Sequence, residues 1–172
     1  MKPGPPPPLT VAQQLLNLRG DPAVPGQGTL RQGGLTWRCD LQPTPLSRTY
    51  GVRIQYWQGG TPQVFVDHPN LVELAQGRLL PHVYDQSPAR LCLYMPARGE
   101  WHGGLLISRT IVQWTMLWLY FFEEWLASGE WKGGGEHPPP MLDRPKVCRG
   151  RRTPASRPRS SPPSNNAIKV AS

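Results

Sequence analysis

Cys92 is the side chain of this sequence best suited to covalent chemistry. It lies in the segment RLCLYMP, between apolar neighbours and just after a loop that contains Pro88. A thiolate is a strong nucleophile and a thiol a weak one, and an unperturbed cysteine with a pKa of about 8.5 is only slightly ionised at neutral pH. The alternative is that Cys92 is a small core residue, which is the usual role of a free cysteine.

Two basic side chains near Cys92 in the sequence could assist this nucleophile. His82 precedes Cys92 by ten residues and Arg90 precedes it by two. A cation or a hydrogen-bond donor beside the sulfur stabilises the thiolate, so both residues are candidates for that task. Histidine is also able to act as a general base near neutral pH, although we expect His82 to hold its loop in shape. Arg90 is equally compatible with a position in solvent.

Acyl transfer from sulfur to an amine places a negative charge on the carbonyl oxygen. Donors aimed at that oxygen therefore matter more than a strong base. The Tyr84 hydroxyl and the backbone amides around Tyr94 are the expected donors. Asp85 is a candidate for accepting a proton from the incoming amine, and the alternative is that it caps the loop.

The positive charge is concentrated at the C-terminal end of the chain. The net charge is +8, and the segment 137–172 holds eight Lys or Arg residues and one acid, whereas the remaining residues hold 11 basic and 10 acidic side chains. Proline and glycine together make up 40 of 172 residues, and the prolines gather near both ends. We therefore expect a nearly neutral body between disordered ends. A nucleic-acid role of the basic tail is a minor alternative.

The three cysteines are Cys39, Cys92 and Cys148, and no CxxC pair or histidine at metal-ligand spacing accompanies them. This pattern indicates neither a disulfide framework nor a metal site, and it favours a reducing environment. The N-terminal residues lack the basic-then-apolar pattern of a secretory signal. We expect a cytoplasmic protein.

The most apolar stretch runs from Leu105 to Phe122. It contains Arg109 and Gln113, and its uninterrupted part is shorter than the roughly 20 residues that a bilayer requires. A buried helix from Ser108 to about Ala127, ended by Gly129, is expected, with membrane insertion as the alternative. Its aromatic residues recur every three or four positions, as in core or interface packing: Trp114, Trp118, Phe121, Phe122 and Trp125.

Three extended segments precede the cysteine. Leu35–Leu41 and Tyr50–Trp57 alternate apolar and polar residues, and Gln63–Val66 forms the third segment. The turn residues from Gly59 to Pro62 separate the last two. The pattern predicts an antiparallel meander.

The other segments give weaker signals. Leu9–Leu18 has the spacing of a short amphipathic helix capped at Thr10. Gly20–Gly34 is rich in glycine and proline, as linkers are. Pro69–Pro81 fits a short helix or a loop, and Pro81–Trp101 is expected to be irregular. Three strands followed by a helix predict an α+β domain in which the helix covers one face of the sheet.

The order of these motifs resembles that of ubiquitin-conjugating enzymes. In that family a His-Pro-Asn triplet precedes the active-site cysteine, and a tryptophan follows it after a polar loop. Here PHVY at 81–84 stands where the triplet would be, LCL at 91–93 matches the cysteine pattern and EW at 100–101 matches the tryptophan. The resemblance implies catalytic and supporting roles for six residues: Cys92, His82 and Tyr84 as catalytic, and Trp101, Asp85 and Arg90 as supporting.

A closer similarity is to the ubiquitin-conjugating-like proteins of bacterial antiphage CBASS operons. Their sequences carry PHVY, LCLY, a tryptophan and an aromatic helix that closes in EWLxSGEWxGGGEHP, and this chain has EWLASGEWKGGGEHP from Glu124 to Pro138. The similarity implies a ubiquitin-conjugating-like domain over residues 35–138, in which a meander packs on a C-terminal helix. Residues 1–34 would be a Pro/Gly-rich segment with a short helix, and residues 139–172 a disordered basic tail.

The same similarity implies a function and a partner. Cys92 would take the C-terminus of a cGAS/DncV-like nucleotidyltransferase from the same operon as a thioester and pass it to an amine, such as a lysine of an acceptor protein. No cofactor or metal is implied. Gly133–Gly135 lacks the flanking strand and Lys-Ser/Thr of a phosphate loop, so activation of the carboxyl group is expected to come from another protein or from the partner itself.

Two departures from the family pattern are visible. Tyr84 replaces the asparagine of the triplet, and a phenol donates a hydrogen bond with a different geometry. A literal His68-Pro69-Asn70 occurs, but it ends 22 residues before Cys92, and we expect it to close the third strand. The alternative function is a non-catalytic module that docks and regulates the nucleotidyltransferase.

Overall fold

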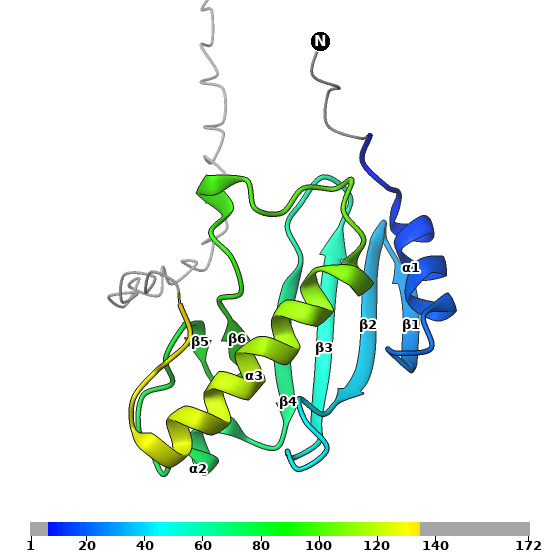
Figure 1. Cartoon of the computed structure of the whole chain (residues 1–172). Helices are drawn as coiled ribbons and strands as arrows, with labels where there is room; N and C mark the ends of the chain where they lie inside the picture. Colours follow the sequence, from blue (N-terminus) through cyan, green and yellow to red (C-terminus); the bar gives the residue numbers. More distant parts are fainter. Residues whose placement is uncertain (1–6, 135–172) are drawn as a thin grey trace, which may run out of the picture. The chain divides into compact units, whose positions relative to one another are not determined.

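The computed structural model describes residues 7–134. Its fold is α+β, as predicted, with an antiparallel sheet ordered β1-β2-β3-β4-β6-β5 and a helix across one face (Figure 1). The strands are β1 (Gly26–Arg31), β2 (Gly34–Leu41), β3 (Tyr50–Trp57), β4 (Gln63–His68), β5 (Val83–Gln86) and β6 (Ala89–Leu91). The helices are α1 (Val11–Gly20), α2 (Leu71–Leu74) and α3 (Ile111–Ser128), with 3₁₀ turns η1 (Pro96–Arg98) and η2 (Ile107–Arg109).

The predicted meander is confirmed as β2, β3 and β4. Each of these strands pairs with the next in antiparallel register, for example Trp37 opposite Ile54. The alternating apolar residues of β2 and β3 all point into the core: Leu35, Trp37, Cys39, Leu41, Tyr50, Val52, Ile54 and Tyr56. Because side chains alternate between the two faces of a strand, this register exposes the intervening polar residues on the other face.

Helix α1 begins where the sequence predicted. The Thr10 hydroxyl accepts a hydrogen bond from the Gln13 backbone amide, and the Gln13 side-chain oxygen accepts one from the Thr10 backbone amide, so the two bonds form a capping box. Leu15 and Leu18 enter the core. The buried Gln14 donates to the Leu105 carbonyl at 2.8 Å and accepts from the Ile107 amide at 3.0 Å, so α1 also holds the segment before α3.

The prediction of a linker over Gly20–Gly34 was wrong. Residues 26–31 form β1, an edge strand that pairs with β2, and the side chains of β1 are mostly exposed. A Cβ at Gly28 would lie 2.3 Å from Leu15 Cδ1 and 2.8 Å from the Trp37 ring, so glycine is needed where the strand meets the indole. Composition alone suggested a flexible segment, but these glycines serve close packing.

The prediction of an irregular segment over Pro81–Trp101 was wrong in its first half. Val83–Gln86 and Ala89–Leu91 pair as a short hairpin, and β6 also pairs with β4 through Phe65 opposite Arg90. The strands are shorter than the typical five or six residues, which hides their alternation in the sequence. The hairpin places Cys92 directly after the end of β6.

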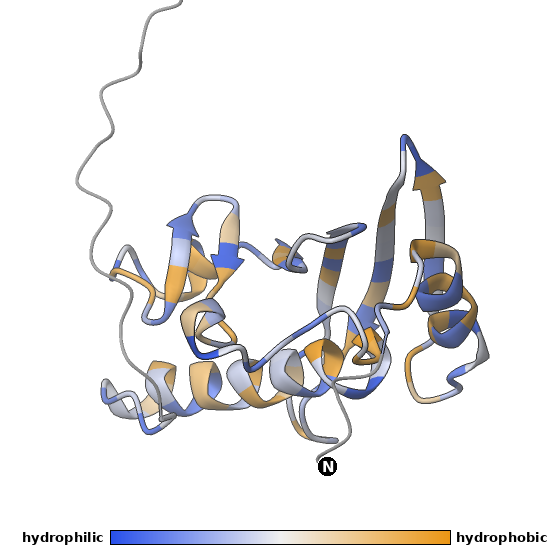
Figure 2. Cartoon of the chain, turned by 90° about the horizontal axis from the view of Figure 1, so that it is seen from above, coloured by the Kyte–Doolittle hydropathy of each residue, from blue (hydrophilic) through white to orange (hydrophobic). Residues whose placement is uncertain are grey.

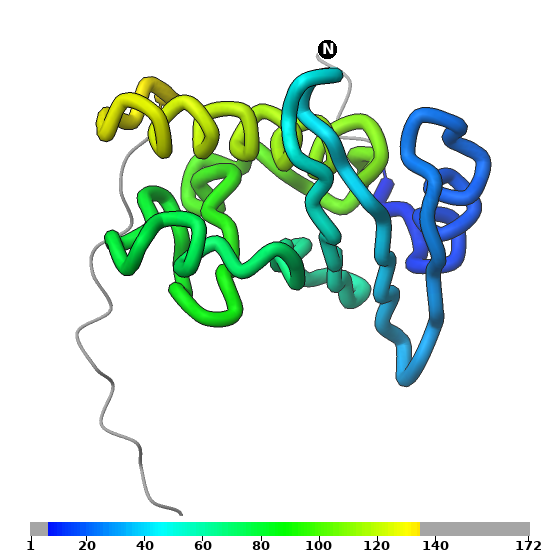
Figure 3. Tube along the Cα trace, turned by 90° about the horizontal axis from the view of Figure 1, so that it is seen from below, coloured from blue at the N-terminus to red at the C-terminus, as the bar shows by residue number. Residues whose placement is uncertain are grey.

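Helix α3 lies along one side of the sheet, while α1 lies at the end near β1 (Figures 2 and 3). The helix was predicted from Ser108 to Ala127, and the η2 turn takes up its first residues. Gly129 ends it in the left-handed conformation, with φ of 77°, as predicted. Its buried side includes Trp118, Phe122 and Trp125. Among residues 7–134, no helix has the length and hydropathy needed to cross a bilayer.

The literal His68-Pro69-Asn70 closes a strand and starts a helix. His68 is the last residue of β4, and its Nε2 lies 3.7 Å from Asp40 Oδ1 with both side chains exposed. Asn70 caps α2 by accepting a hydrogen bond from the Val72 amide at 3.0 Å. The segment 69–81 therefore contains the short helix that was one of its two predicted forms. The predicted basic tail, residues 139–172, and residues 135–138 of the EWLASGEWKGGGEHP sequence lie outside the described residues.

We predict that Gly28→Ala lowers the free energy of unfolding by about 1–3 kcal/mol, because the new methyl group must displace the buried Trp37 and Leu15. Urea denaturation followed by circular dichroism measures the change. Gly20→Ala is the matched control, since a Cβ there meets nothing within 4 Å and alanine favours a helix. Equal stabilities of the two variants would show that β1 does not pack as described.

Candidate functional site

Cys92 is anchored to the loop that precedes the hairpin. Its backbone N–H donates to the His82 carbonyl at 2.9 Å, and its side chain is half-buried. His82 has φ of 49°, in the left-handed region, where the backbone turns before entering β5. The two residues that flank the hairpin are thus held side by side.

The His82 side chain is enclosed. Its relative exposure is 5 %, and its imidazole stacks on Trp131 with ring centroids 4.9 Å apart. Its carbonyl also accepts a hydrogen bond from Trp118 Nε1 at 3.0 Å. These contacts agree with a histidine that holds the loop in shape.

The Tyr84 hydroxyl lies close enough to the Cys92 side chain for the two groups to interact. Burial, and then the interaction with the Cys92 side chain, raise the pKa of Tyr84 well above its usual value. The phenol therefore stays protonated over the physiological range and remains a donor. The sequence placed Tyr84 near the cysteine, and the structure brings them into contact.

Arg90 and Asp85 form an ion pair beside Tyr84. Arg90 Nε lies 2.6 Å from Asp85 Oδ2, and the guanidinium lies over the Tyr84 ring at 4.9 Å from its centroid. The Asp85 carboxylate is paired with Arg90, and the Arg90 guanidinium packs on the Tyr84 ring. The ion pair therefore supports the position of the phenol.

A pocket of about 230 Å³ opens at the sulfur. The described residues that line it come from both sides of the cysteine and from the segment after α3: His82, Cys92, Leu93, Tyr94, Met95, Arg98, Glu100 and Gly134. Arg98, Glu100 and Gly134 were not predicted as site residues. Of these three, Glu100 appeared in the sequence analysis only as the neighbour of Trp101 in the EW pair, which was matched to the family for its tryptophan.

The loop after Cys92 is fastened at several points. The Tyr94 hydroxyl donates to the Pro62 carbonyl at 3.2 Å, and its ring lies 5.5 Å from that of Trp114 on α3. Burial, and then the charge of Cys92, help raise the pKa of Tyr94 to about 12. Trp101 is buried edge-on against Tyr56, with centroids 5.4 Å apart, so this predicted supporting residue anchors the far end of the loop.

The segment after α3 returns to the cysteine. Beyond Gly129 the chain turns back past β5 (Figure 1). Besides the His82 imidazole, Trp131 contacts the rings of Trp118 and Phe121, with centroids 5.6 and 6.0 Å away. Gly134 then forms part of the pocket wall. This packing gives the EWKGG sequence a structural role at the site.

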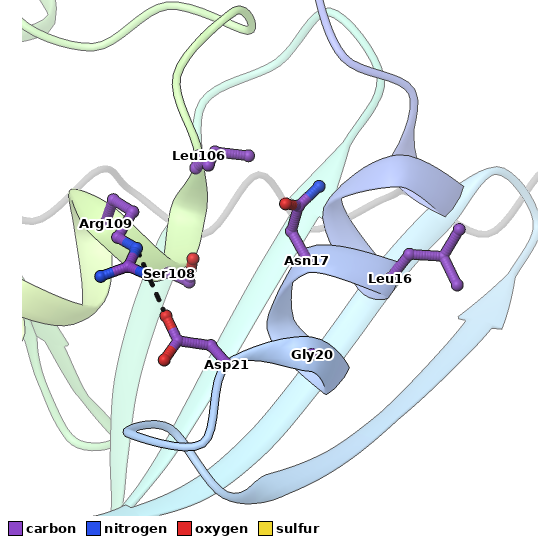
Figure 4. A pocket seen from close by; sticks show the side chains of 7 residues that line it. All are labelled: Leu16, Asn17, Gly20, Asp21, Leu106, Ser108 and Arg109. Atoms are coloured by element: carbon purple, nitrogen blue, oxygen red, sulfur yellow. Dashed lines mark ion pairs between the residues drawn. The ribbon is translucent and has the colours of Figure 1, made fainter.

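A second pocket, of about 300 Å³, lies between α1 and η2 (Figure 4). Asp21 and Arg109 face each other across it, with Oδ2 and Nε 3.5 Å apart. Its other lining residues include Asn17 and Ser108 but no cysteine or histidine. The ion pair connects the end of α1 to the turn before α3. Cys92 does not line this second pocket, so we do not assign the cysteine chemistry to it. Within the described part of the chain, no group of three or more His, Cys, Asp or Glu side chains is arranged to hold a metal ion.

The comparison with protein families decides the family. The sequence profile described as type II CBASS E2 protein matches residues 14–138, which include the whole sheet, the cysteine loop and α3. The chain belongs to the type II CBASS E2 family. No curated protein sequence matches it. As a CBASS E2-like protein, it carries Cys92 at a half-exposed site between a hairpin and a loop, with His82 and Tyr84 in contact with it.

We predict that one thiol of the folded CBASS E2 domain reacts with iodoacetamide at pH 8 when Cys148 is replaced by serine. Cys39 is buried in β2, and burial raises its pKa to about 12, so its thiolate fraction is roughly a thousandfold below that of a free cysteine. Peptide mapping should locate the label at Cys92. Both thiols should react in denaturant, and native labelling of Cys39 at a similar rate would contradict the assignment.

We predict that Tyr84→Phe slows alkylation of Cys92 by about 2- to 10-fold, because the thiolate loses a nearby hydroxyl group that is able to donate to it. Stopped-flow measurement of the labelling rate tests this. Tyr120→Phe, on the exposed side of α3, is the control and should leave the rate unchanged. If both variants react like the original protein, Tyr84 does not influence the sulfur.

Proposed function

We propose that this CBASS E2 protein carries the C-terminus of a cGAS/DncV-like nucleotidyltransferase as a thioester on Cys92 and transfers it to an amine. The observation that carries the proposal is the half-exposed Cys92, which opens into a pocket and contacts the Tyr84 hydroxyl, in a chain of this family. The antiparallel sheet crossed by α3 supports a ubiquitin-conjugating-like fold.

In the loading step, the Cys92 thiolate attacks the activated carbonyl carbon of the donor's C-terminus. A C–S bond forms and the activating group leaves with its electron pair. Tyr84 supports this step by donating to the sulfur and so favouring the thiolate. The protein that activates the carboxyl group is supplied in trans.

In the transfer step, an amine nitrogen attacks the thioester carbonyl and a negative charge develops on the oxygen. The Cys92 amide is already bonded to His82, and the Met95 amide donates to Glu100 at 2.8 Å. The amides of Leu93 and Tyr94, in the same loop, are therefore our candidates for stabilising that charge. Collapse of the intermediate breaks the C–S bond and releases the thiolate.

His82 acts in this proposal by positioning. Its carbonyl receives both the Cys92 amide and the Trp118 indole, and its ring is covered by Trp131. An amine that arrives from solvent does not meet an imidazole that is 5 % exposed. The proposal therefore assigns His82 the task of fixing the loop, which in turn fixes the sulfur.

We predict that coexpression with the neighbouring nucleotidyltransferase gives an adduct whose mass is the sum of the two proteins less one water. The adduct should disappear with hydroxylamine, because a thioester is cleaved by that nucleophile. Intact mass spectrometry detects it. Cys92→Ala should abolish the adduct, and Cys148→Ser, which changes another cysteine, should retain it.

An undiminished hydroxylamine-sensitive adduct in Cys92→Ala would remove Cys92 from the mechanism. A different result separates the docking alternative: antiphage protection that survives Cys92→Ala would show that the protein serves as a binding module. Protection lost in Cys92→Ala, with the nucleotidyltransferase still bound, would favour the transferase.

A further inference from the structure

The pocket at Cys92 contains a carboxylate that thioester formation does not use. Among the described residues that line the pocket, Glu100 is the only Asp or Glu. Once Cys92 is acylated, its sulfur carries no charge. Glu100 is then the only formal negative charge among these lining residues, whose other titratable members are His82, Tyr94 and Arg98.

Glu100 is held in place by the loop itself. Its Oε2 accepts a hydrogen bond from the Met95 amide at 2.8 Å, across the η1 turn. Gly99, with φ of 64°, reverses the chain after that turn, and buried Trp101 fixes the next position. The turn thus places Glu100 in the pocket wall. The residue is also exposed, so a group that arrives from solvent can reach its carboxylate.

The other candidate proton acceptors are less well placed. Asp85 is bound to the Arg90 guanidinium at 2.6 Å. The His82 imidazole lies under Trp131 and is almost fully buried. Asp85 does not line the pocket, whereas Glu100 both lines it and is exposed to solvent.

The transfer step creates a need for such a group. A lysine side chain with a pKa of about 10.4 is protonated at neutral pH, and an ammonium ion has no lone pair with which to attack. A carboxylate beside the thioester attracts the ammonium ion and accepts its proton as the nitrogen approaches the carbonyl carbon.

We propose that Glu100 is the binding group and proton acceptor for the acceptor amine, a primary ammonium such as lysine. This inference rests on the proposed function. The ammonium gives one proton to the Glu100 carboxylate, and the free nitrogen attacks the thioester carbonyl. The C–S bond breaks with its electrons on sulfur. The attacking nitrogen loses a second proton to the thiolate or to water, and Glu100 returns its proton to solvent.

The test compares two nucleophiles on the isolated thioester. The adduct with the nucleotidyltransferase is purified at acidic pH and shifted to pH 7 with free L-lysine or with hydroxylamine, and its decay is followed by intact mass. Hydroxylamine is largely uncharged at this pH and needs no deprotonation before attack. Glu100→Gln retains an oxygen that accepts from the Met95 amide but removes the charge.

We predict that Glu100→Gln leaves thioester formation unchanged, slows discharge to lysine by about a hundredfold and leaves discharge to hydroxylamine within twofold. Glu73→Gln on α2 is the matched control and should behave like the original protein, because Glu73 accepts a hydrogen bond from Asn70 away from the pocket.

Each contrary outcome has a separate meaning. Unchanged discharge to lysine in Glu100→Gln would overturn the inference, and so would equal slowing with both nucleophiles, which would indicate a role in loop structure. Absence of any thioester on the original protein would instead overturn the proposed function.

Discussion

The backbone carbonyl of His82 is the point on which the arrangement of the cysteine loop depends. It accepts from the Cys92 amide on one side and from the Trp118 indole on the other, at 2.9 and 3.0 Å. The first bond closes the base of the β5–β6 hairpin, and the second joins that base to α3. A buried acceptor that lost these donors would carry an unfavourable desolvation cost. The left-handed backbone of His82 is thereby supported by contacts from two separate parts of the chain.

The charged groups around the sulfur are divided between two sides. On the hairpin side, Arg90 and Asp85 neutralise each other and hold Tyr84, whose phenol remains a neutral donor. On the loop side, the Glu100 carboxylate accepts from the Met95 amide, and Arg98 lines the same pocket. Under the proposals above, one set of residues stabilises the thiolate and the other receives the ammonium ion. In the proposed reaction the two tasks belong to successive steps.

The sequence predicted the longer elements well and the shorter ones poorly. Alternation over eight residues identified β2 and β3, and Thr10 and Gly129 marked helix ends because caps have local chemistry. Strands β5 and β6, of four and three residues, are too short to show a period. Strand β1 was missed because glycines that pack against Trp37 have the composition of a linker.

The sequence indicated the site residues that belong to recognisable motifs, and it did not indicate the others. Cys92, His82 and Tyr84 were selected from sequence, and the structure brings them together. Trp131 reaches His82, and Gly134 reaches the pocket, because the chain reverses after α3. A local sequence pattern does not show that the segment after a helix will return to a distant loop. Glu100 reaches the pocket because the loop turns back through η1, which its spacing from Cys92 does not reveal.

The strand order also determines how this protein responds to oxidants. Cys39 lies on β2 and Cys92 follows β6, so β3 and β4 stand between them and the two residues are roughly 14 Å apart across the sheet at normal strand spacing. A disulfide requires Cα atoms within about 7 Å. Of the two cysteines in the described residues, neither can therefore resolve a sulfenic acid on the other. A peroxide-modified Cys92 would depend on a thiol from outside this sheet to escape irreversible conversion to the sulfinic acid.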